Sequence, residues 1–488
     1  MSPLYESVLS TMWQSRSFPG TLATSDGRKV TILEPGVLNP DGGPDFHDAL
    51  IRIGGTLYRG DVELHVDARS WSTHGHESDP HYNGVILHVV CRSPHFVTRT
   101  ATGRVVPLLE VDGPSALRLN QAARAPQPSL LPCTSWNHTL PVPLIRRWLR
   151  IMRHERLQNK VSRLEERLKE LAQDRKNLLC EPGPDLPYAE DIVPPSGLTY
   201  SRQDLAAKSL WEQLLYEGTM DGLGYAKNRQ SMRSLARSLP LDLLRKFSFE
   251  DTWTMEALLF GASGLLPDPL GHYDEESVRY ILALQNRWRE VRPFFRSSIL
   301  DPADWLFFRM RPVNFPTARL AMMATLLPKL FGRTGFRQCI DIARAPYGSR
   351  PQIVQEFEGM YRVRPSTYWE TRCMFGPARG RSGAVLGRGR IIDILVNTIV
   401  PLLLLYSCVF RDGRVRRGAI GLYAALPPAQ ENCVTLQMNR DLVKGRFLLR
   451  GASGQQALLQ LYNAYCRAGR CADCWIGRAR IKHRHQGE

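Results

Sequence analysis

The sequence predicts an α+β protein, in which a mixed β-sheet domain with flanking helices is followed by a mainly α-helical region and a small Cys-containing C-terminal segment. Two patterns indicate this fold class. Short runs of alternating apolar residues, bounded by glycine and polar residues, fill the chain as far as residue 111. After residue 141, apolar residues recur every three or four positions instead. We therefore expect domains at residues 1–120, 141–410 and 411–488.

The first domain contains six strand-like segments. They are rich in β-branched and aromatic residues, and Gly54-Gly55 and Thr102-Gly103 supply hairpin turns. A short helix is expected over residues 4–15, and a turn or short helix between Asp67 and Tyr82. The predicted strands are residues 28–35, 46–54, 56–66, 84–91, 95–100 and 104–111.

The helical region starts with a regular apolar seam. Leucine and valine residues are spaced 4-3-4-3 from Leu157 to Leu171, which is typical of a helix that packs along one face. The Pro-rich residues 181–197 are predicted to form a linker. The apolar run 391–410 has 20 residues, enough to cross a bilayer. It contains Asp393, however, and charge inside a membrane is costly, so we expect a buried core helix and no membrane span.

The charge of the chain is high and uneven. Its 488 residues are 43% hydrophobic and 23% charged, as in ordinary globular proteins, but the formal net charge is +17 and the pI is about 9.6. Residues 1–120 hold 10 basic and 13 acidic side chains, so the positive excess lies beyond them. This predicts a polyanionic partner, with nucleic acid ahead of an anionic membrane. Codon bias in a GC-rich genome is an alternative cause of the preference for arginine.

The N-terminus and the cysteines indicate a cellular compartment. No basic segment precedes an apolar core at the N-terminus, so a signal peptide is not predicted. Ten cysteines in a chain without a secretory signal are expected to be mostly reduced thiols. We therefore expect a cytoplasmic protein, for which the sequence favours no particular oligomeric state.

Two carboxylates mark the hairpin formed by the second and third predicted strands. Asp45 precedes one strand, and the alternation of the next strand puts Glu63 and His65 on a single face. In the simpler interpretation, this polar face of a β-hairpin is exposed to water. In the alternative, Asp45 and Glu63 converge and a cation between them relieves their repulsion. Mg²⁺ or Mn²⁺ accepts such oxygen ligands and activates water.

Pro44-Asp45 and Glu63-Leu64-His65 resemble the motif of the PD-(D/E)xK nuclease superfamily, and the predicted strand order resembles its core. The resemblance implies Asp45 and Glu63 as catalytic metal ligands of a DNA or RNA phosphodiesterase. His65 stands where the superfamily has the lysine that orients or activates water. A histidine can act as a general base near neutral pH, but it does not reproduce a permanently charged lysine. No lysine occurs between Lys29 and Lys160.

The same domain is rich in histidine, with seven of the 12 histidines between His47 and His95. One hypothesis adds neighbouring side chains to the acidic site as accessory residues. A second places a separate transition-metal site at His74 and His76, with Glu77 and Asp79 as oxygen donors. The alternative is a polar loop whose histidines bond to the backbone. The accessory candidates are His74, His76, Asp79 and His88.

Three cysteines near the C-terminus are candidates for a structural metal centre. Cys466, Cys471 and Cys474 have the spacing C-x4-C-x2-C, and thiolates at such spacing reach one zinc ion or iron–sulfur cluster. A fourth ligand would come from Cys433 upstream or from His483 or His485 downstream. The alternative is a set of buried thiols without metal.

A basic segment at residues 361–390 is the predicted contact surface for nucleic acid. It holds seven arginines and one glutamate, with tyrosine and tryptophan between them. Arginine and aromatic side chains together bind backbones and single strands. The candidate residues are Arg362, Arg364, Arg372, Arg379, Arg381, Arg388 and Arg390.

The whole chain is similar to a bacterial family known only as domain of unknown function 2851. The segments that carry this similarity are "LNPDGGPDFHDALIRIGGTLYRGDVELHV", "WSTHGHESDPHYNGVILHVV", "GLGYAKNRQSMRSLA", "RPVNFPTARLA" and "LYNAYCRAGRCADCWIG". The first functional hypothesis is a metal-dependent nuclease or nuclease-like protein. The alternatives are a non-catalytic nucleic-acid-binding or scaffold protein on a degenerate nuclease core, and a different metallohydrolase that uses the histidines.

Overall fold

The structure is a computed structural model of the 488-residue chain. It divides into two compact units, Met1–Pro128 with Phe307–Arg309, and Ser129–Leu306 with Met310–Glu488. We call them the sheet unit and the helical unit, and describe each by itself. The residues that the structure describes are 9–10, 12–18, 20–39, 43–92, 96–111, 131–179, 200–271, 273–308, 310–332, 334–346, 350–378, 386–430 and 432–484.

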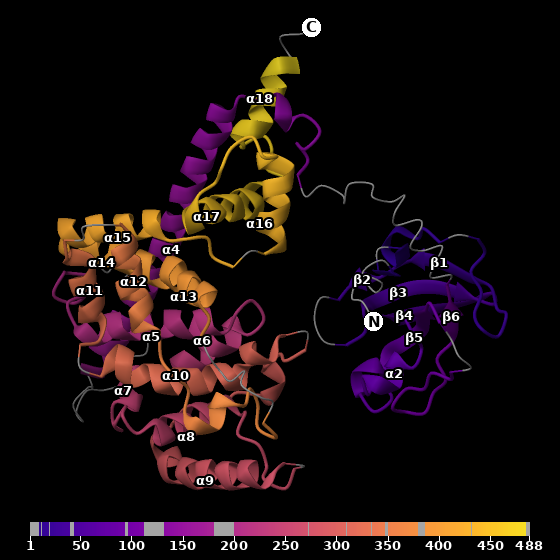
Figure 1. The fold of residues 1–488 in the computed structure, drawn as a ribbon, viewed down its shortest axis with the longest axis horizontal. Helices are drawn as coiled ribbons and strands as arrows, with labels where there is room; N and C mark the ends of the chain where they lie inside the picture. The colour runs from indigo at the N-terminus through magenta and orange to yellow at the C-terminus, as the bar shows by residue number, and fades with distance from the viewer. Residues whose placement is uncertain are drawn as a thin grey trace, which may run out of the picture. The chain divides into compact units, whose positions relative to one another are not determined.

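The sheet unit is built on a mixed sheet of six strands (Figure 1). The strand order is β1-β3-β4-β5-β6, and β2 pairs with β3. β3 is antiparallel to β1, β2 and β4, whereas β4, β5 and β6 run parallel. The strands are β1 (Val30–Glu34), β2 (Val37–Leu38), β3 (Phe46–Ile53), β4 (Thr56–His65), β5 (Val85–Val90) and β6 (Leu108–Glu110).

Most predicted strands are confirmed, with shorter bounds, and β2 was not predicted. The strand expected at 95–100 is wrong over its described residues. There the Arg99 carbonyl accepts a hydrogen bond from the Trp71 indole at 2.8 Å, and Thr100 closes a tight turn to Arg104, which leaves a single bridge from Arg99 to Val105. The expected helix at 4–15 lies partly outside the described residues, and residues 9–10 and 12–15 are helical.

Both faces of the sheet are covered at the end of β4. One face packs Phe46, Ile51, Val62 and Leu64 into an apolar core that also contains Trp13. The other face lies beneath the segment between β4 and β5, which holds α2 (Ser70–Thr73) and the 3-10 helix η1 (Pro80–Gly84). The polar face of β4 is therefore not exposed to water at this end, contrary to the simpler interpretation of the alternation.

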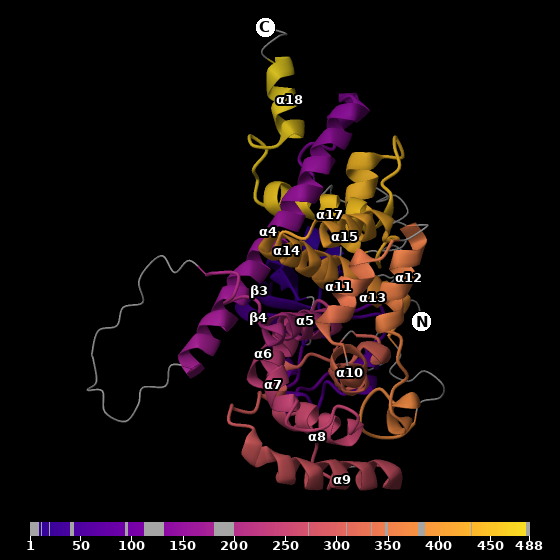
Figure 2. The ribbon, with the colours of Figure 1, turned by 90° about the vertical axis from the view of Figure 1, so that its left-hand side faces the viewer.

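The helical unit contains only helices and loops in its described residues (Figures 1 and 2). The long helix α4 (Val142–Leu179) packs against α5, α14 and α17, and Leu168 of its predicted seam is fully buried. The other helices are α5 (Lys208–Leu223), α6 (Arg229–Ser238), α7 (Leu241–Leu244), α8 (Thr252–Ser263), α9 (Glu275–Val291), α10 (Pro316–Phe331), α11 (Phe336–Arg344), α12 (Arg350–Met360), α13 (Arg388–Ile394), α14 (Val400–Phe410), α15 (Gly413–Ala425), α16 (Cys433–Met438), α17 (Gly451–Leu461) and α18 (Trp475–Arg484), with π-helical segments η7 (Leu395–Ile399), η8 (Asn439–Val443) and η9 (Tyr462–Cys466) and 3-10 turns η2 (Asn137–Thr139), η3 (Arg292–Phe294), η4 (Pro302–Asp304), η5 (Pro312–Asn314) and η6 (Thr367–Glu370).

The predicted apolar helix is formed by α13, η7 and α14 in succession. Among the described residues, Arg388–Phe410 is the one helix whose length and composition would allow it to cross a membrane, and 72% of its most apolar window is buried. It packs closely on α5, where the Thr398 hydroxyl donates to the Gly218 carbonyl at 3.0 Å. A Cβ atom at Gly218 would lie 2.3 Å from the Thr398 methyl, so this contact requires glycine.

Candidate metal centre

The end of β4 and the segment that follows it bring five polar side chains to one place. Alternation along β4 directs Glu63 and His65 to the same face, and the parallel register places His88 of β5 beside Glu63. Trp71 of α2 is fully buried and fixes the following turn. His74 ends α2 and His76 follows after Gly75, whose φ of 76° suits a glycine in this reversal.

The two predicted carboxylates lie side by side. The Asp45 backbone N–H donates to Glu63 Oε2 at 2.9 Å, and the Leu64 N–H donates to Asp45 Oδ2 at 3.1 Å. Glu63 is 5% exposed, whereas Asp45 is half-buried. Both carboxylates are therefore held by the backbone of the opposite strand, and the hairpin brings them together as its length predicts.

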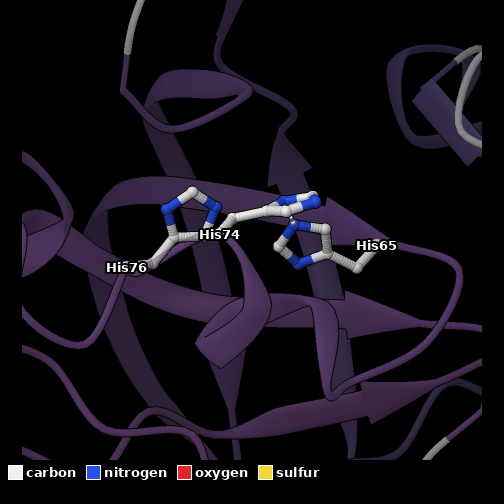
Figure 3. A group of neighbouring side chains, drawn as sticks. All are labelled: His65, His74 and His76. Atoms are coloured by element: carbon white, nitrogen blue, oxygen red, sulfur yellow. Dashed lines mark hydrogen bonds between the residues drawn. The ribbon is translucent and has the colours of Figure 1, made fainter. Parts of the chain in front are cut away.

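The imidazoles of His65, His74 and His76 lie together (Figure 3), and two of them approach Glu63. Glu63 Oε1 lies 3.4 Å from His65 Nε2 and 3.5 Å from His76 Nε2, and His65 Nε2 lies 3.2 Å from His74 Nδ1. One ligand atom of each histidine lies within 4.8 Å of those of the other two. His65 and His76 are buried, while His74 is exposed at the edge of the group. Three nitrogen donors and a carboxylate oxygen thus converge from a strand and a turn.

His88 orients His65 from beneath. His65 Nδ1 lies 2.9 Å from His88 Nε2, and His88 Nδ1 lies 2.8 Å from the Thr98 hydroxyl. These hydrogen bonds occupy Nδ1 of His65, so the Nε2 atom of the same ring faces Glu63 and His74. An imidazole that is hydrogen-bonded through one nitrogen presents the other in a fixed direction. Thr98 was not predicted as part of the site, because no sequence pattern around it distinguishes it from a strand residue.

Burial keeps two of the imidazoles uncharged. It lowers the pKa of His76 to about 4, with a smaller lowering from His74 that Asp79 partly offsets. Burial likewise lowers the pKa of His88 to about 3. His76 stacks on Tyr82 at 3.7 Å between ring centroids, and its Nε2 is buried without a hydrogen-bond partner among the described residues. A neutral imidazole with an unused nitrogen is the form that binds a metal ion.

Asp79 lies apart from this group. Its carboxylate caps η1 by accepting the His81 N–H at 3.0 Å, and it also contacts His81 Nδ1 at 2.8 Å. Of the predicted residues of the sheet unit, the structure therefore brings together Asp45, Glu63, His65, His74, His76 and His88, and gives Asp79 a local structural contact.

The predicted arginines of the basic segment are mostly paired with carboxylates. Arg372 is 5% exposed and bonds to Asp274 and Glu276, and Arg362 and Arg388 both bond to Glu358 at 2.8 Å. The remaining described members are Arg390, which covers the Tyr225 ring and contacts Asp393, and Arg364, which is exposed. Arg379 and Arg381 lie outside the described residues. Their role as a nucleic-acid surface stays a prediction.

The three C-terminal cysteines lie between the end of η9 and the start of α18. Cys474 is buried, and Cys466 and Cys471 are half-buried. Cys433, one suggested fourth ligand, is exposed at the first residue of α16. The side chain of His483 and all of His485 lie outside the described residues. The thiol that does approach the group is Cys133, from the segment before α4, which sequence spacing did not indicate.

The family described as "Protein of unknown function (DUF2851)" matches residues 6–181 and 202–432. The chain therefore belongs to this family, as the sequence segments indicated. No curated protein and no solved structure matches the chain. The family description assigns no activity, so the functional argument depends on the site itself.

Proposed function

We propose that the chain is a metal-dependent hydrolase of phosphodiester bonds, whose metal ion is held by Glu63, His65, His74 and His76. The observation that carries this proposal is the close group of three histidines at the end of β4, with the Glu63 carboxylate beside His65 and His76. Buried polar groups are normally hydrogen-bonded. In this group only His74 is exposed, and His76 Nε2 has no hydrogen-bond partner among the described residues, so the three imidazoles and the carboxylate are a typical set of metal ligands.

The donor set favours a transition metal. Imidazole nitrogen suits zinc, iron, copper and nickel, whereas magnesium and manganese favour oxygen donors. The proposal therefore replaces Mg²⁺ with metals such as zinc, and keeps the Mn²⁺ of the sequence hypothesis as a second ion to test. Such an ion, when bound, lowers the pKa of a coordinated water and stabilises charge on phosphoryl oxygens.

The chain's own groups have distinct roles in this proposal. His88 and Thr98 hold the His65 ring so that Nε2 faces the site. Asp45, fixed by the Leu64 N–H, lies beside Glu63 and can accept a proton from the attacking water. Exposed His74 leaves one side of the group open to a substrate.

The choice of phosphodiesters comes from charge and pattern. The net charge of +17 favours polyanionic substrates. The Pro44-Asp45 and Glu63-Leu64-His65 pattern resembles nucleases that cleave this bond. DNA and RNA are therefore the substrates to test first.

The experiment measures bound metal and cleavage together. We expect the purified chain to contain about one transition-metal ion at this site, and to cleave labelled single- or double-stranded DNA or RNA when Mn²⁺ is supplied. The variants His74→Ala and Glu63→Gln should lose metal and activity, because each removes one donor. His81→Ala is the matched control, since His81 is an exposed histidine of the same unit whose imidazole contacts Asp79.

Two results would contradict the proposal. One is a metal content that does not differ between His74→Ala, Glu63→Gln and His81→Ala. The other is intact metal binding with no cleavage of any nucleic acid. The second result, together with retained nucleic-acid binding in Asp45→Asn, would favour the non-catalytic alternative. In that alternative Asp45 and Glu63 have a structural role, in which each carboxylate accepts a backbone N–H of the hairpin.

A further inference from the structure

A cavity of about 310 Å³ in the helical unit is lined mainly by basic side chains. Its walls come from α4, α5, α6, η7 and α17. The volume is at the lower end of the range for small-ligand sites. The charged side chains that line it are Arg156, Lys160, Arg163, Arg167, Glu217, Asp221, Arg229, Arg233 and Arg237.

The two carboxylates in the wall are already engaged. Glu217 bonds to Arg167 at 2.9 Å and lies 3.5 Å from Arg237. Asp221 pairs with both Arg229 and Arg233. The remaining three basic side chains, Arg156, Lys160 and Arg163, therefore give the cavity an uncompensated positive charge.

The hydrogen-bond partners of Lys160 are neutral, although its side chain carries an ammonium group. Its ammonium donates to two neutral amides, Asn397 Oδ1 at 2.7 Å and Gln456 Oε1 at 2.6 Å. Arg156 Nε shares the same Gln456 oxygen at 2.6 Å. Burial, and then the charges of Arg156 and Arg229, lower the pKa of Lys160 well below its usual value, against a smaller opposing effect of Asp393. A buried ammonium held only by amides is destabilised unless an anion reaches it.

We propose that this cavity binds a phosphate group carrying more than one negative charge, with Lys160, Arg156 and Arg163 as its main contacts. Guanidinium and ammonium groups together are the usual ligands of such groups. The source of the phosphate is either a small phosphorylated molecule or the phosphorylated end of a nucleic acid. The inference does not rest on hydrolysis by the sheet unit.

The test titrates the full chain with inorganic pyrophosphate by calorimetry at constant ionic strength. We expect Lys160→Met to bind at least about tenfold more weakly, because a charged hydrogen bond to the anion is lost. Arg163→Ala should weaken binding less, and because the Arg163 side chain is exposed the substitution should leave the fold intact. Lys169→Met is the matched control, because Lys169 is on the same helix but pairs with Glu165 outside the cavity.

Competition experiments distinguish the two sources of the phosphate, and two results of the titration would contradict the proposal. Competition by a 5′-phosphorylated but not a 5′-hydroxyl oligonucleotide assigns the phosphate to a nucleic-acid end. No competition by either oligonucleotide assigns it to a small molecule. Equal affinity for pyrophosphate in Lys160→Met and Lys169→Met, or no binding by the unaltered chain, would overturn the proposal. Neither result depends on whether the sheet unit binds metal.

A second inference concerns three neighbouring cysteines of the C-terminal segment and a fourth, distant in the sequence, in the same part of the helical unit. Cys474 is part of a buried apolar cluster, and Cys133 and Cys466 pack against it. Cys471 joins them through a turn, in which the Cys474 N–H donates to its carbonyl at 3.3 Å. The Cβ that any other residue would carry at Gly477 would lie 2.0 Å from that carbonyl oxygen, so the turn is fixed by close backbone packing.

The thiols lie close enough to influence one another. Burial raises the pKa of Cys466 to about 12, and the charges of Cys133, Cys474 and Cys471 add to this effect. Burial also raises the pKa of Cys133, with contributions from Cys474 and Cys471. Burial raises the pKa of the Cys474 thiol, against a smaller lowering by hydrogen bonds from the N–H groups of Gly477 and Ile476 at the start of α18. Such donors favour a thiolate.

The spacing of the thiols indicates the kind of centre. Four thiolates at about 2.3 Å from a single zinc ion would lie only ~3.8 Å from one another. Among the described side chains, the only group of three or more ligand atoms all within 4.8 Å is that of the histidines. No three of these four thiols lie that close together, whereas a [4Fe–4S] cluster takes its four cysteine ligands on four separate irons.

We propose that Cys133, Cys466, Cys471 and Cys474 hold a [4Fe–4S] cluster that links the segment before α4 to the C-terminal segment. The full chain, purified without oxygen, should contain about four iron and four sulfide per molecule and show the visible absorption of such a cluster. Cys133→Ser should lose the cluster. Cys433→Ser is the control, because Cys433 is exposed and outside the group.

Circular dichroism of each variant separates loss of the cluster from loss of folding. Full iron content in a folded Cys133→Ser variant would overturn the assignment of the fourth ligand. Absence of iron, after reconstitution of the full chain with ferrous iron and sulfide, would overturn the cluster. Zinc in place of iron, lost in Cys133→Ser, would also overturn it in favour of a single ion.

Discussion

Buried ionisable side chains are treated differently in the two units. In the helical unit, buried carboxylates are paired with cations, as Glu217 is with Arg167 and Glu358 is with Arg362 and Arg388. In the sheet unit, the buried Glu63 has imidazoles as its near neighbours, and two buried imidazoles there have strongly lowered pKa values. The first arrangement neutralises charge within the fold, whereas the second leaves donors that an added cation would satisfy.

This difference changes how the positive charge of the chain is interpreted. Arginines that looked like a binding surface in the sequence, such as Arg372, are partly used to compensate acidic residues of the helical unit. A count of basic residues therefore overestimates the charge that is available to a partner. Lys160 differs from these arginines, because its ammonium donates to two neutral amides.

The largest effect that we expect from this comparison is a fall in the free energy of unfolding of the sheet unit at acid pH. The pKa of His88 is about 3 in the folded state and about 6.5 when exposed, because burial disfavours its charge. Because the pKa of His88 is lowered on folding, its contribution to the stability of the sheet unit is complete above pH 6.5 and is lost as the pH falls towards 3. The free energy of unfolding should fall by about 4 kcal/mol in metal-free protein.

Hydrogen exchange of β5 amides between pH 7 and pH 4 measures this change. His88→Gln should flatten the pH dependence, while His47→Gln, which alters a half-exposed histidine, should not. If the β5 amides lose no protection in acid relative to those of α8, the two units would not differ as described.

The next effect concerns ion pairs. Arg167→Met would leave the buried Glu217 with the longer contact to Arg237 and the neutral Gln213 amide, and should lower the free energy of unfolding by about 3 kcal/mol. Glu63→Gln in metal-free protein should change it by less than about 1 kcal/mol, because the glutamine carbonyl can still accept the Asp45 N–H and the side chain's described ring neighbours are imidazoles. Urea denaturation of both variants makes the comparison, with Lys169→Met as the surface control. Equal losses in both variants would remove the distinction between the units.

Much of the sheet was predictable because its signals are local. Alternation and glycine turns located β3 and β4, and the length of the hairpin predicted that Asp45 would meet Glu63. The segment at 96–100 was mispredicted because tertiary contacts with Trp71 override its β propensity. The histidine group was visible as composition, but only the turn at Gly75 decides that His74 and His76 face His65.

The remaining features depend on long-range contacts that no local pattern encodes. Arg372 finds Asp274 and Glu276, which lie about three helices earlier in the chain. Cys133 approaches the C-terminal cysteines from the segment before α4. No sequence pattern distinguishes Lys160 from the other basic residues of α4, whereas packing of α4 against η7 and α17 brings the Asn397 and Gln456 amides to it.

The smallest of these effects tests an exception within the helical unit. Glu256 is 1% exposed, and its partners are the hydroxyls of Ser366 and Tyr280. Burial raises its pKa to about 7, against the lowering by those hydrogen bonds. A raised pKa means that its contribution to stability is complete below pH 4.5 and is lost as the pH rises through 7. We expect the free energy of unfolding to fall by about 2 to 3 kcal/mol as the pH rises over this range, whereas that of the sheet unit falls in acid.

Hydrogen exchange of α8 amides at pH 5 and pH 8 measures this change, and Glu256→Gln should abolish the difference between the two pH values. A helical unit that gains stability over this range would show that Glu256 is compensated like the other buried acids.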